Sequence, residues 1–154
     1  MATQTLMTTP PPLPVTDAQR RALIEQAMTA RQNAYVPYSD YPVGAALLTA
    51  AGDVFTGCNI DNASYGATVC GERTAVFKAV SEGEREFQAI AVVTSNGAAP
   101  CGICRQVLYE FGPHMTVITA DADGVITWEG PLTDLLPLGF GPHKLAEGQR
   151  AAKA

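Results

Sequence analysis

The sequence has no concentration of positive charge. Its 154 residues include 10 Lys and Arg against 15 Asp and Glu, which gives a formal net charge of −5, and no cluster of Lys and Arg occurs along the chain. A surface that binds nucleic acid normally carries a basic stripe, so this composition argues against DNA or RNA as a partner. The charge balance favours a small, uncharged ligand instead.

Long apolar runs are also lacking. No segment approaches the roughly 20 consecutive apolar residues that a membrane-spanning helix needs. The first fifteen residues, MATQTLMTTPPPLPV, contain no Lys or Arg and no continuous apolar stretch, so they do not resemble a signal peptide. We therefore expect no membrane partner and a cytoplasmic location. Cysteine is scarce, and four cysteines in such a chain indicate metal binding or catalysis before disulfides.

The length suits one domain with a substantial core. We expect a disordered extension over residues 1–15, because its four prolines favour an extended linker. A single folded domain is expected over residues 16–143, followed by a polar tail over residues 144–154.

Apolar periodicity and turn residues predict an α/β protein. Helices are expected over residues 16–34, 70–83 and 101–111, with a short helical turn over 133–136. Strands are expected over residues 43–48, 54–58, 89–94, 116–120 and 125–129. This order suits a central mixed five-stranded sheet with helices on its faces.

Two short motifs place three cysteines and a glutamate at the starts of two predicted helices. The motifs are CGE from Cys70 and PCGIC from Pro100. Thiolates of Cys70, Cys101 and Cys104 can hold a tetrahedral zinc ion and leave its fourth position open, which is typical of a catalytic zinc site. Glu72 is not needed as a ligand and can carry protons. This combination is the three-cysteine form of the signature of zinc nucleobase deaminases.

Five segments in the correct order resemble the small free-nucleoside cytidine deaminases of the zinc-dependent cytidine and deoxycytidylate deaminase superfamily. They are YVPYSDYPVGAALL from Tyr35, GCNIDNASYG from Gly57, CGERTAVFKAVSEG from Cys70, PCGICRQVLYEF from Pro100 and LLPLGFGP from Leu135. The resemblance implies a three-layer α/β/α fold and one zinc ion per subunit. It also implies hydrolytic deamination of cytidine and deoxycytidine to uridine and deoxyuridine with release of ammonia, a reaction of pyrimidine salvage, with Glu72 as the catalytic proton carrier.

The resemblance also implies how the substrate is bound. Asn59 and Asp61 would hydrogen-bond the ribose hydroxyls, and Tyr41 would stack on the pyrimidine. Phe140 would reach into the site of a neighbouring subunit, in a homotetramer whose sites are completed by neighbours. Two positions depart from the family pattern, which usually has Glu in place of Asp61 and Phe in place of Tyr41. The shorter acid loses more than about 1 Å of reach, which bears on the preference for the sugar.

The remaining polar residues near the motifs have expected roles of their own. Three thiolates on a divalent zinc ion leave a net charge of about −1, which opposes the acidification of water. Arg73 or Arg105 is expected to hydrogen-bond a thiolate and withdraw some of this charge, with surface ion pairs as the alternative.

Cys58 is expected to be buried and inert. His114 and His143 are expected to be solvated rather than metal ligands.

Three other functions stay open from the residues. The C-x-x-C at Cys101 and Cys104 also suits thiol–disulfide exchange, although that function leaves Cys70 and Glu72 without a role. A non-catalytic zinc-stabilised interaction module would require a fourth protein ligand. Deamination of a modified cytidine or another amino-heterocycle is the nearest alternative, because Asp61 and Tyr41 lie at positions that determine specificity.

Overall fold

The computed structural model describes residues 14–152, so most of the extension expected over residues 1–15 lies outside the described part. Its elements in chain order are α1 (Asp17–Arg31), β1 (Gly44–Thr49), β2 (Val54–Cys58), η1 (Tyr65–Ala67), α2 (Gly71–Ser81), β3 (Phe87–Val93), α3 (Gly102–Phe111), β4 (Thr116–Ala120), β5 (Ile126–Pro131), α4 (Leu132–Leu135) and α5 (Pro142–Ala151). Within residues 14–152, no helix combines the length and the apolar character needed to cross a membrane.

The five strands form one mixed sheet in the order β2-β1-β3-β4-β5. Neighbouring strands are antiparallel except β3 and β4, which are parallel. Strands β1 and β3 are buried along their whole length, as expected for strands covered on both faces. The predicted α/β architecture with a mixed five-stranded sheet is confirmed.

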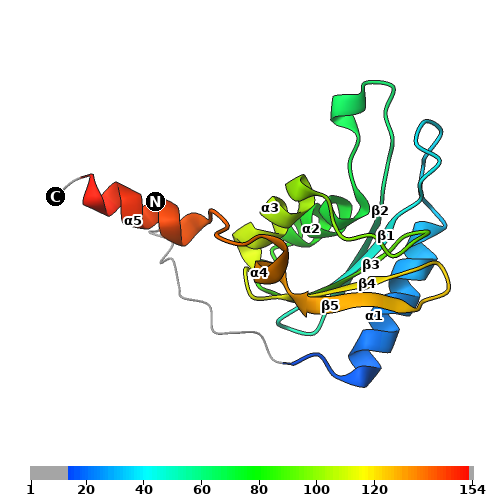
Figure 1. The fold of residues 1–154 in the computed structure, drawn as a ribbon, viewed down its shortest axis with the longest axis horizontal. Coiled ribbons are helices and arrows are strands. Elements are labelled where there is room, and N and C mark those ends of the chain that lie inside the picture. Colours follow the sequence, from blue (N-terminus) through cyan, green and yellow to red (C-terminus); the bar gives the residue numbers. More distant parts are fainter. Residues whose placement is uncertain (1–13, 153–154) are drawn as a thin grey trace.

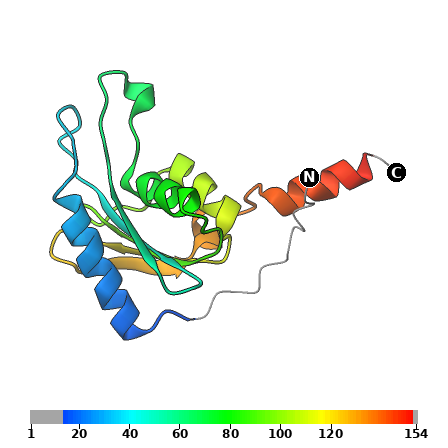
Figure 2. The ribbon, with the colours of Figure 1, turned by 180° about the vertical axis from the view of Figure 1, so that it is seen from behind.

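Helix α1 covers one face of the sheet (Figures 1 and 2). It begins with a capping box in which Thr16 and Gln19 exchange side-chain and backbone hydrogen bonds. Its buried stripe consists of Leu23, Ile24, Ala27 and Ala30. A Cβ atom at Gly44 in β1 would lie 2.0 Å from the carbonyl oxygen of Ala27, so only glycine allows the helix to approach the sheet this closely.

Helices α2 and α3 lie on the opposite face, which completes three layers (Figure 1). The core on this side includes Val76 from α2, Leu108 from α3 and Ile90 from β3, all fully buried. A Cβ atom at Gly57 in β2 would lie 2.5 Å from the backbone nitrogen of Ala75. This close approach fixes α2, and the residues at its start, against the edge strand β2.

The topology brings the two cysteine motifs to one end of the sheet, where β2 and β3 finish. Gly44, the first residue of β1, pairs with Cys58 on one side and with Val93 on the other. These partners are the last residues of β2 and β3, so the C-terminal ends of both strands lie at the same end of the sheet. The loop after β2 leads to Cys70, and the loop after β3 leads to Cys101. The predicted convergence of the motifs follows from this register.

The C-terminal segment contains a helix that the sequence analysis did not predict. The polar composition of residues 144–154 predicts a tail, but α5 runs from Pro142 to Ala151 and projects away from the sheet (Figures 1 and 2). Proline at the first position favours helix initiation, and the following Leu, Ala, Glu, Gln and Arg are good helix formers. These local signals were present in the sequence.

Candidate metal centre

Three cysteine sulfur atoms meet where α2 and α3 begin. Cys70 is the N-cap of α2, Cys101 is the N-cap of α3, and Cys104 lies in the first turn of α3. Their sulfur atoms all lie within 4.8 Å of one another. The predicted ligands are therefore brought together by two helices that start far apart in the sequence.

The spacing of the sulfur atoms fits zinc. The Sγ atoms of Cys70 and Cys101 are 3.9 Å apart. Two thiolates at about 2.3 Å from a tetrahedral zinc ion are separated by about 3.8 Å, so the observed distance matches. Among residues 14–152, no other group of three or more His, Cys, Asp or Glu side chains has this ligand spacing. Cys58, His114 and His143 are outside the group.

The surroundings favour a thiolate at Cys70. Its pKa falls to about 5, first because the Cys104 thiol donates a hydrogen bond to it and then because the Arg73 guanidinium lies close by. Nη2 of Arg73 is 3.5 Å from Sγ of Cys70 and also donates to the carbonyl of Thr68. The same hydrogen bond to Cys70, together with burial, raises the pKa of Cys104. A thiolate at Cys70 is therefore stabilised by the guanidinium of Arg73.

Arg105 lies near the cluster but bonds to backbone carbonyls. Its Nε donates to the carbonyl of Pro100 at 2.6 Å, and its Nη1 donates to the carbonyl of Leu135 at 2.9 Å. Of the two arginines expected to contact a thiolate, the structure thus places Arg73 on a sulfur and gives Arg105 a different set of partners.

Glu72 is a buried acid in the first turn of α2, two residues after Cys70. Its side chain is 4% exposed, and its Oε2 has no hydrogen-bond partner among residues 14–152. Burial raises the pKa of Glu72 to about 7. A carboxyl group with a pKa near neutrality can both accept and release a proton at physiological pH, which is the property required of a proton carrier.

Asn59 follows directly after β2 and holds the backbone before β1. Its Oδ1 accepts a hydrogen bond from the backbone N–H of Val43, and its Nδ2 donates to the carbonyl of Tyr41, both at 2.8 Å. The side chain is buried. An amide nitrogen has two hydrogens, so one N–H of Asn59 stays available for a ligand.

Asp61 anchors the turn that contains Ser39. Its Oδ2 accepts hydrogen bonds from the backbone N–H and the hydroxyl of Ser39, both at 2.9 Å, and from the backbone N–H of Tyr38 at 3.2 Å. The backbone N–H of Ser39 is the main cause of the lowered pKa of Asp61. All three bonds go to one oxygen, so the other, Oδ1, is not used by this turn.

Tyr41 has a partner that the sequence analysis missed. Its hydroxyl donates to Oδ1 of Asn96 at 2.6 Å, and its ring packs against the buried cluster that also contains α2 and α3 residues. A tyrosine where the family usually has phenylalanine brings a hydroxyl that needs a partner, and this was the available signal. Nothing in the local sequence identified Asn96.

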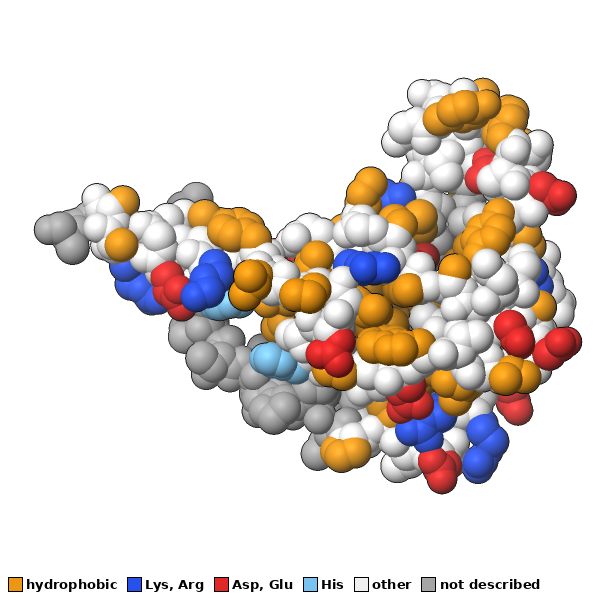
Figure 3. Space-filling model, viewed as in Figure 1, with side chains coloured by type: hydrophobic (Ala, Val, Ile, Leu, Met, Phe, Trp, Pro, Cys, Tyr) orange, Lys and Arg blue, Asp and Glu red, His pale blue; other side chains and the backbone are white. Residues whose placement is uncertain are grey.

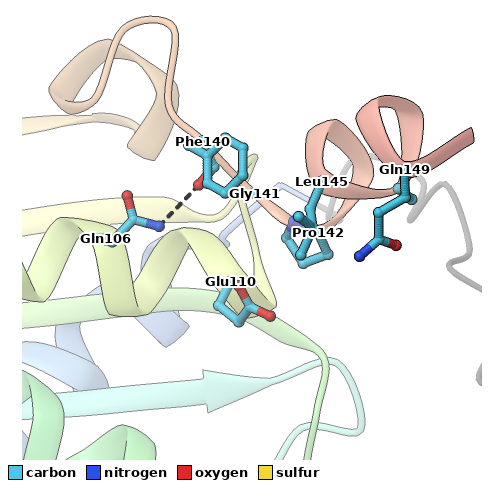
Figure 4. Close-up of a pocket in the computed structure, with 8 residues that line it drawn as sticks. Gln106, Glu110, Phe140, Gly141, Pro142, Leu145 and Gln149 are labelled. Atoms are coloured by element: carbon cyan, nitrogen blue, oxygen red, sulfur yellow. Dashed lines mark hydrogen bonds between the residues drawn. The ribbon is translucent and has the colours of Figure 1, made fainter. Parts of the chain in front are cut away.

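Phe140 lies apart from the cysteines within one chain. Its side chain is 59% exposed, and its carbonyl accepts a hydrogen bond from Nε2 of Gln106 at 2.9 Å (Figure 4). It lines a cleft of about 320 Å³ between α3 and α5, together with residues such as Glu110 and Leu145. The cleft is lined by neither Glu72 nor any cysteine. It is therefore separate from the sulfur cluster.

Comparison with known protein families gives one match that covers most of the domain. The family described as the cytidine and deoxycytidylate deaminase zinc-binding region matches residues 17–120. This range includes both cysteine motifs and the whole sheet except β5.

Individual relatives agree with this match. The chain is 49% identical over 127 residues to the cytidine deaminase of Sporosarcina psychrophila, covering 80% of this chain and 93% of the relative. It is 52% identical over 124 residues to the cytidine deaminase of Halalkalibacterium halodurans, covering 79% and 93%. The crystal structure of cytidine deaminase from Burkholderia pseudomallei superimposes with a TM-score of 0.74 at 50% identity, covering 78% of this chain and 98% of that one.

Proposed function

The chain belongs to the cytidine and deoxycytidylate deaminase family, and we propose that it acts with one zinc ion held by Cys70, Cys101 and Cys104 and with Glu72 as its proton carrier. The reaction is the zinc-dependent hydrolytic deamination of cytidine. The observation that carries this proposal is the meeting of three sulfur atoms within 4.8 Å of one another, next to a buried acid whose pKa is near 7.

The chemistry divides between the metal and the side chains. When bound, zinc supplies Lewis acidity that makes water a nucleophile near neutral pH. Glu72 takes a proton from the attacking water, delivers a proton to N3 of the cytosine ring, and later helps to protonate the departing amino group. The water oxygen becomes bonded to C4, the C4–N bond breaks, and ammonia leaves. Arg73 offsets the excess negative charge of the thiolates through its hydrogen bond to Cys70.

The proposed substrate contacts follow the matching family positions. Asn59 and Asp61 bind the ribose hydroxyls, with support from the remaining N–H of Asn59 and from the Oδ1 of Asp61 that the Ser39 turn does not use. The ring of Tyr41 stacks on the pyrimidine. We propose that both cytidine and deoxycytidine are substrates, in cytoplasmic pyrimidine salvage.

We also propose a homotetramer in which neighbouring subunits complete each site. In support, Tyr65 and Phe140 present large apolar side chains to solvent, with exposed fractions of 77% and 59%. Hydrophobic side chains gather at the tip of the projecting loop that contains η1, whereas Lys and Arg form no broad patch on the same face (Figure 3). Exposed apolar surface of this kind marks interaction sites.

Thiol–disulfide exchange is not favoured, because the third sulfur of Cys70 joins the C-x-x-C cysteines and that reaction has no use for Glu72. A modified cytidine or another amino-heterocycle is the alternative substrate, and adenosine in the assay below tests an amino-heterocycle other than cytosine.

The test is an ultraviolet assay of cytidine, deoxycytidine, CMP and adenosine beside a zinc measurement. We expect turnover of the two nucleosides and one zinc ion per chain. Glu72→Gln should keep its zinc and lose nearly all turnover, whereas Glu82→Gln, an exposed change at the other end of the same helix, should leave both unchanged. Substantial turnover by Glu72→Gln would remove Glu72 from the proton transfer, and activity confined to adenosine would overturn the assignment of the substrate.

A further inference from the structure

Arg105 joins two segments that are distant in the sequence. It follows the predicted ligand Cys104 directly, and its Nε bonds to the carbonyl of Pro100, the residue before the ligand Cys101. Its Nη1 bonds to the carbonyl of Leu135, the last residue of α4, 30 positions away. One guanidinium therefore closes the turn containing two metal ligands and attaches that turn to the C-terminal part of the chain.

The next residue of α3 extends this attachment. Nε2 of Gln106 donates to the carbonyl of Phe140 at 2.9 Å (Figure 4). Arg105 and Gln106 thus hold the two ends of the segment 135–140, which we call the C-terminal strap. Within the strap, Leu135 and Leu136 pack against the core, whereas Leu138 is fully exposed, has a φ of 57° and adds no packing.

The hydrogen bonds of Arg105 indicate that it positions the backbone rather than neutralising the charge of the thiolates. Among residues 14–152 it has no carboxylate partner in an ion pair, and its side chain is half-buried. A guanidinium carries five N–H donors in a fixed planar fork, so it can hold two carbonyls at set positions, which the single ammonium of lysine does less well.

We propose that Arg105 is a positioning residue that couples the ligand turn 100–104 to the C-terminal strap, so that metal binding and order in the strap support each other. This inference rests on the proposed zinc ligands. A metal ion that fixes Cys101 and Cys104 also fixes the carbonyl of Pro100, and through Arg105 that of Leu135. The coupling is reciprocal, because a strap that holds Arg105 in place also holds the turn in its metal-binding form.

The first test measures zinc affinity by competition with a chromogenic chelator. Loss of a side chain that orients metal ligands typically weakens binding about 10- to 100-fold, so we expect a weakening in that range for Arg105→Met. Arg105→Lys should recover part of the loss. The matched control is Arg85→Met, because Arg85 also donates to two backbone carbonyls, those of Val80 and Glu84, away from the cysteines. Zinc affinity of Arg105→Met within twofold of the Arg85→Met value would overturn the proposal.

The second test needs no substitution and so does not depend on a variant that folds. Hydrogen exchange is followed in the wild-type chain with zinc bound and after removal by a chelator. We expect peptides covering the strap to exchange at least several-fold faster without zinc, while helix α1 (Asp17–Arg31) keeps its protection. Unchanged exchange in the strap, or an equal loss in α1, would refute the coupling. Wild-type turnover of cytidine, measured in parallel, shows separately whether the proposed function holds.

Discussion

The hydroxyl of Tyr41 donates a hydrogen bond to Oδ1 of Asn96, with 2.6 Å between the two oxygens. The same Oδ1 accepts from the hydroxyl of Thr94, which in turn accepts from the backbone N–H of Ala98. This chain of bonds ties the loop before β1 to the loop that leads from β3 to Cys101. The family pattern usually has phenylalanine in place of Tyr41. Phenylalanine has no hydroxyl, so this hydrogen bond to Asn96 exists because the chain departs from the family pattern.

Tyr41→Phe should separate the role of the hydroxyl from that of the ring. One intramolecular hydrogen bond contributes about 1 kcal/mol, so we expect the free energy of unfolding to fall by about that amount. The ring remains, so turnover of cytidine should be largely kept. Urea unfolding and the ultraviolet assay measure the two effects. Tyr38→Phe is the control, since the Tyr38 side chain is exposed. Loss of most turnover in Tyr41→Phe alone would instead place the hydroxyl in the reaction.

Asp61→Asn should weaken the fold in a pH-dependent way. Hydrogen bonds from the Ser39 turn lower the pKa of Asp61 in the folded chain. The charged form therefore stabilises the fold above the unfolded pKa of about 3.9, and this contribution is lost as the pH falls through the lower folded value. We expect Asp61→Asn to lower the urea midpoint at pH 7, with the difference from wild type shrinking toward pH 3.

The control for that titration is Asp53→Asn, an exposed aspartate in the β1–β2 turn, which should follow wild type across the same range. A difference between wild type and Asp61→Asn that stays constant from pH 7 to pH 3 would show that the charge of Asp61 does not hold the Ser39 turn.

The residues differ in how far sequence alone could predict them. The zinc ligands were predictable because each motif begins a helix and the strand order brings both helix starts to one edge of the sheet. The partners of Arg105 and Tyr41 were not, because Leu135 and Asn96 lie 30 and 55 positions away and are brought near only by tertiary packing. Helix α5 differs again, because its helix-forming signals are local but lie in a polar segment whose composition also suits a tail.

Cys58→Ala should leave the metal content unchanged. Cys58 lies at the end of β2 and is not part of the group of three sulfur atoms. We expect one zinc ion per chain in this variant, measured by atomic absorption, and normal turnover of cytidine. Cys104→Ala is the matched change within the group and should lose most of its zinc. If Cys58→Ala lost its metal, a fourth protein ligand would be indicated, and with it a structural zinc site without an open position.

Leu138→Gly should stabilise the chain. Leu138 has a φ of 57°, in the left-handed region, and its side chain is fully exposed. The left-handed conformation costs a residue with a Cβ atom about 1 kcal/mol relative to glycine, and no packing is lost when this side chain is removed. We expect the free energy of unfolding in urea to rise by up to about 1 kcal/mol. The gain is smaller than the full cost of the left-handed conformation, because glycine also increases the entropy of the unfolded chain. Leu138→Ala is the control, because alanine keeps the Cβ atom and should give no such gain. A midpoint that falls in Leu138→Gly, or rises equally in both variants, would show that backbone strain at residue 138 does not limit stability.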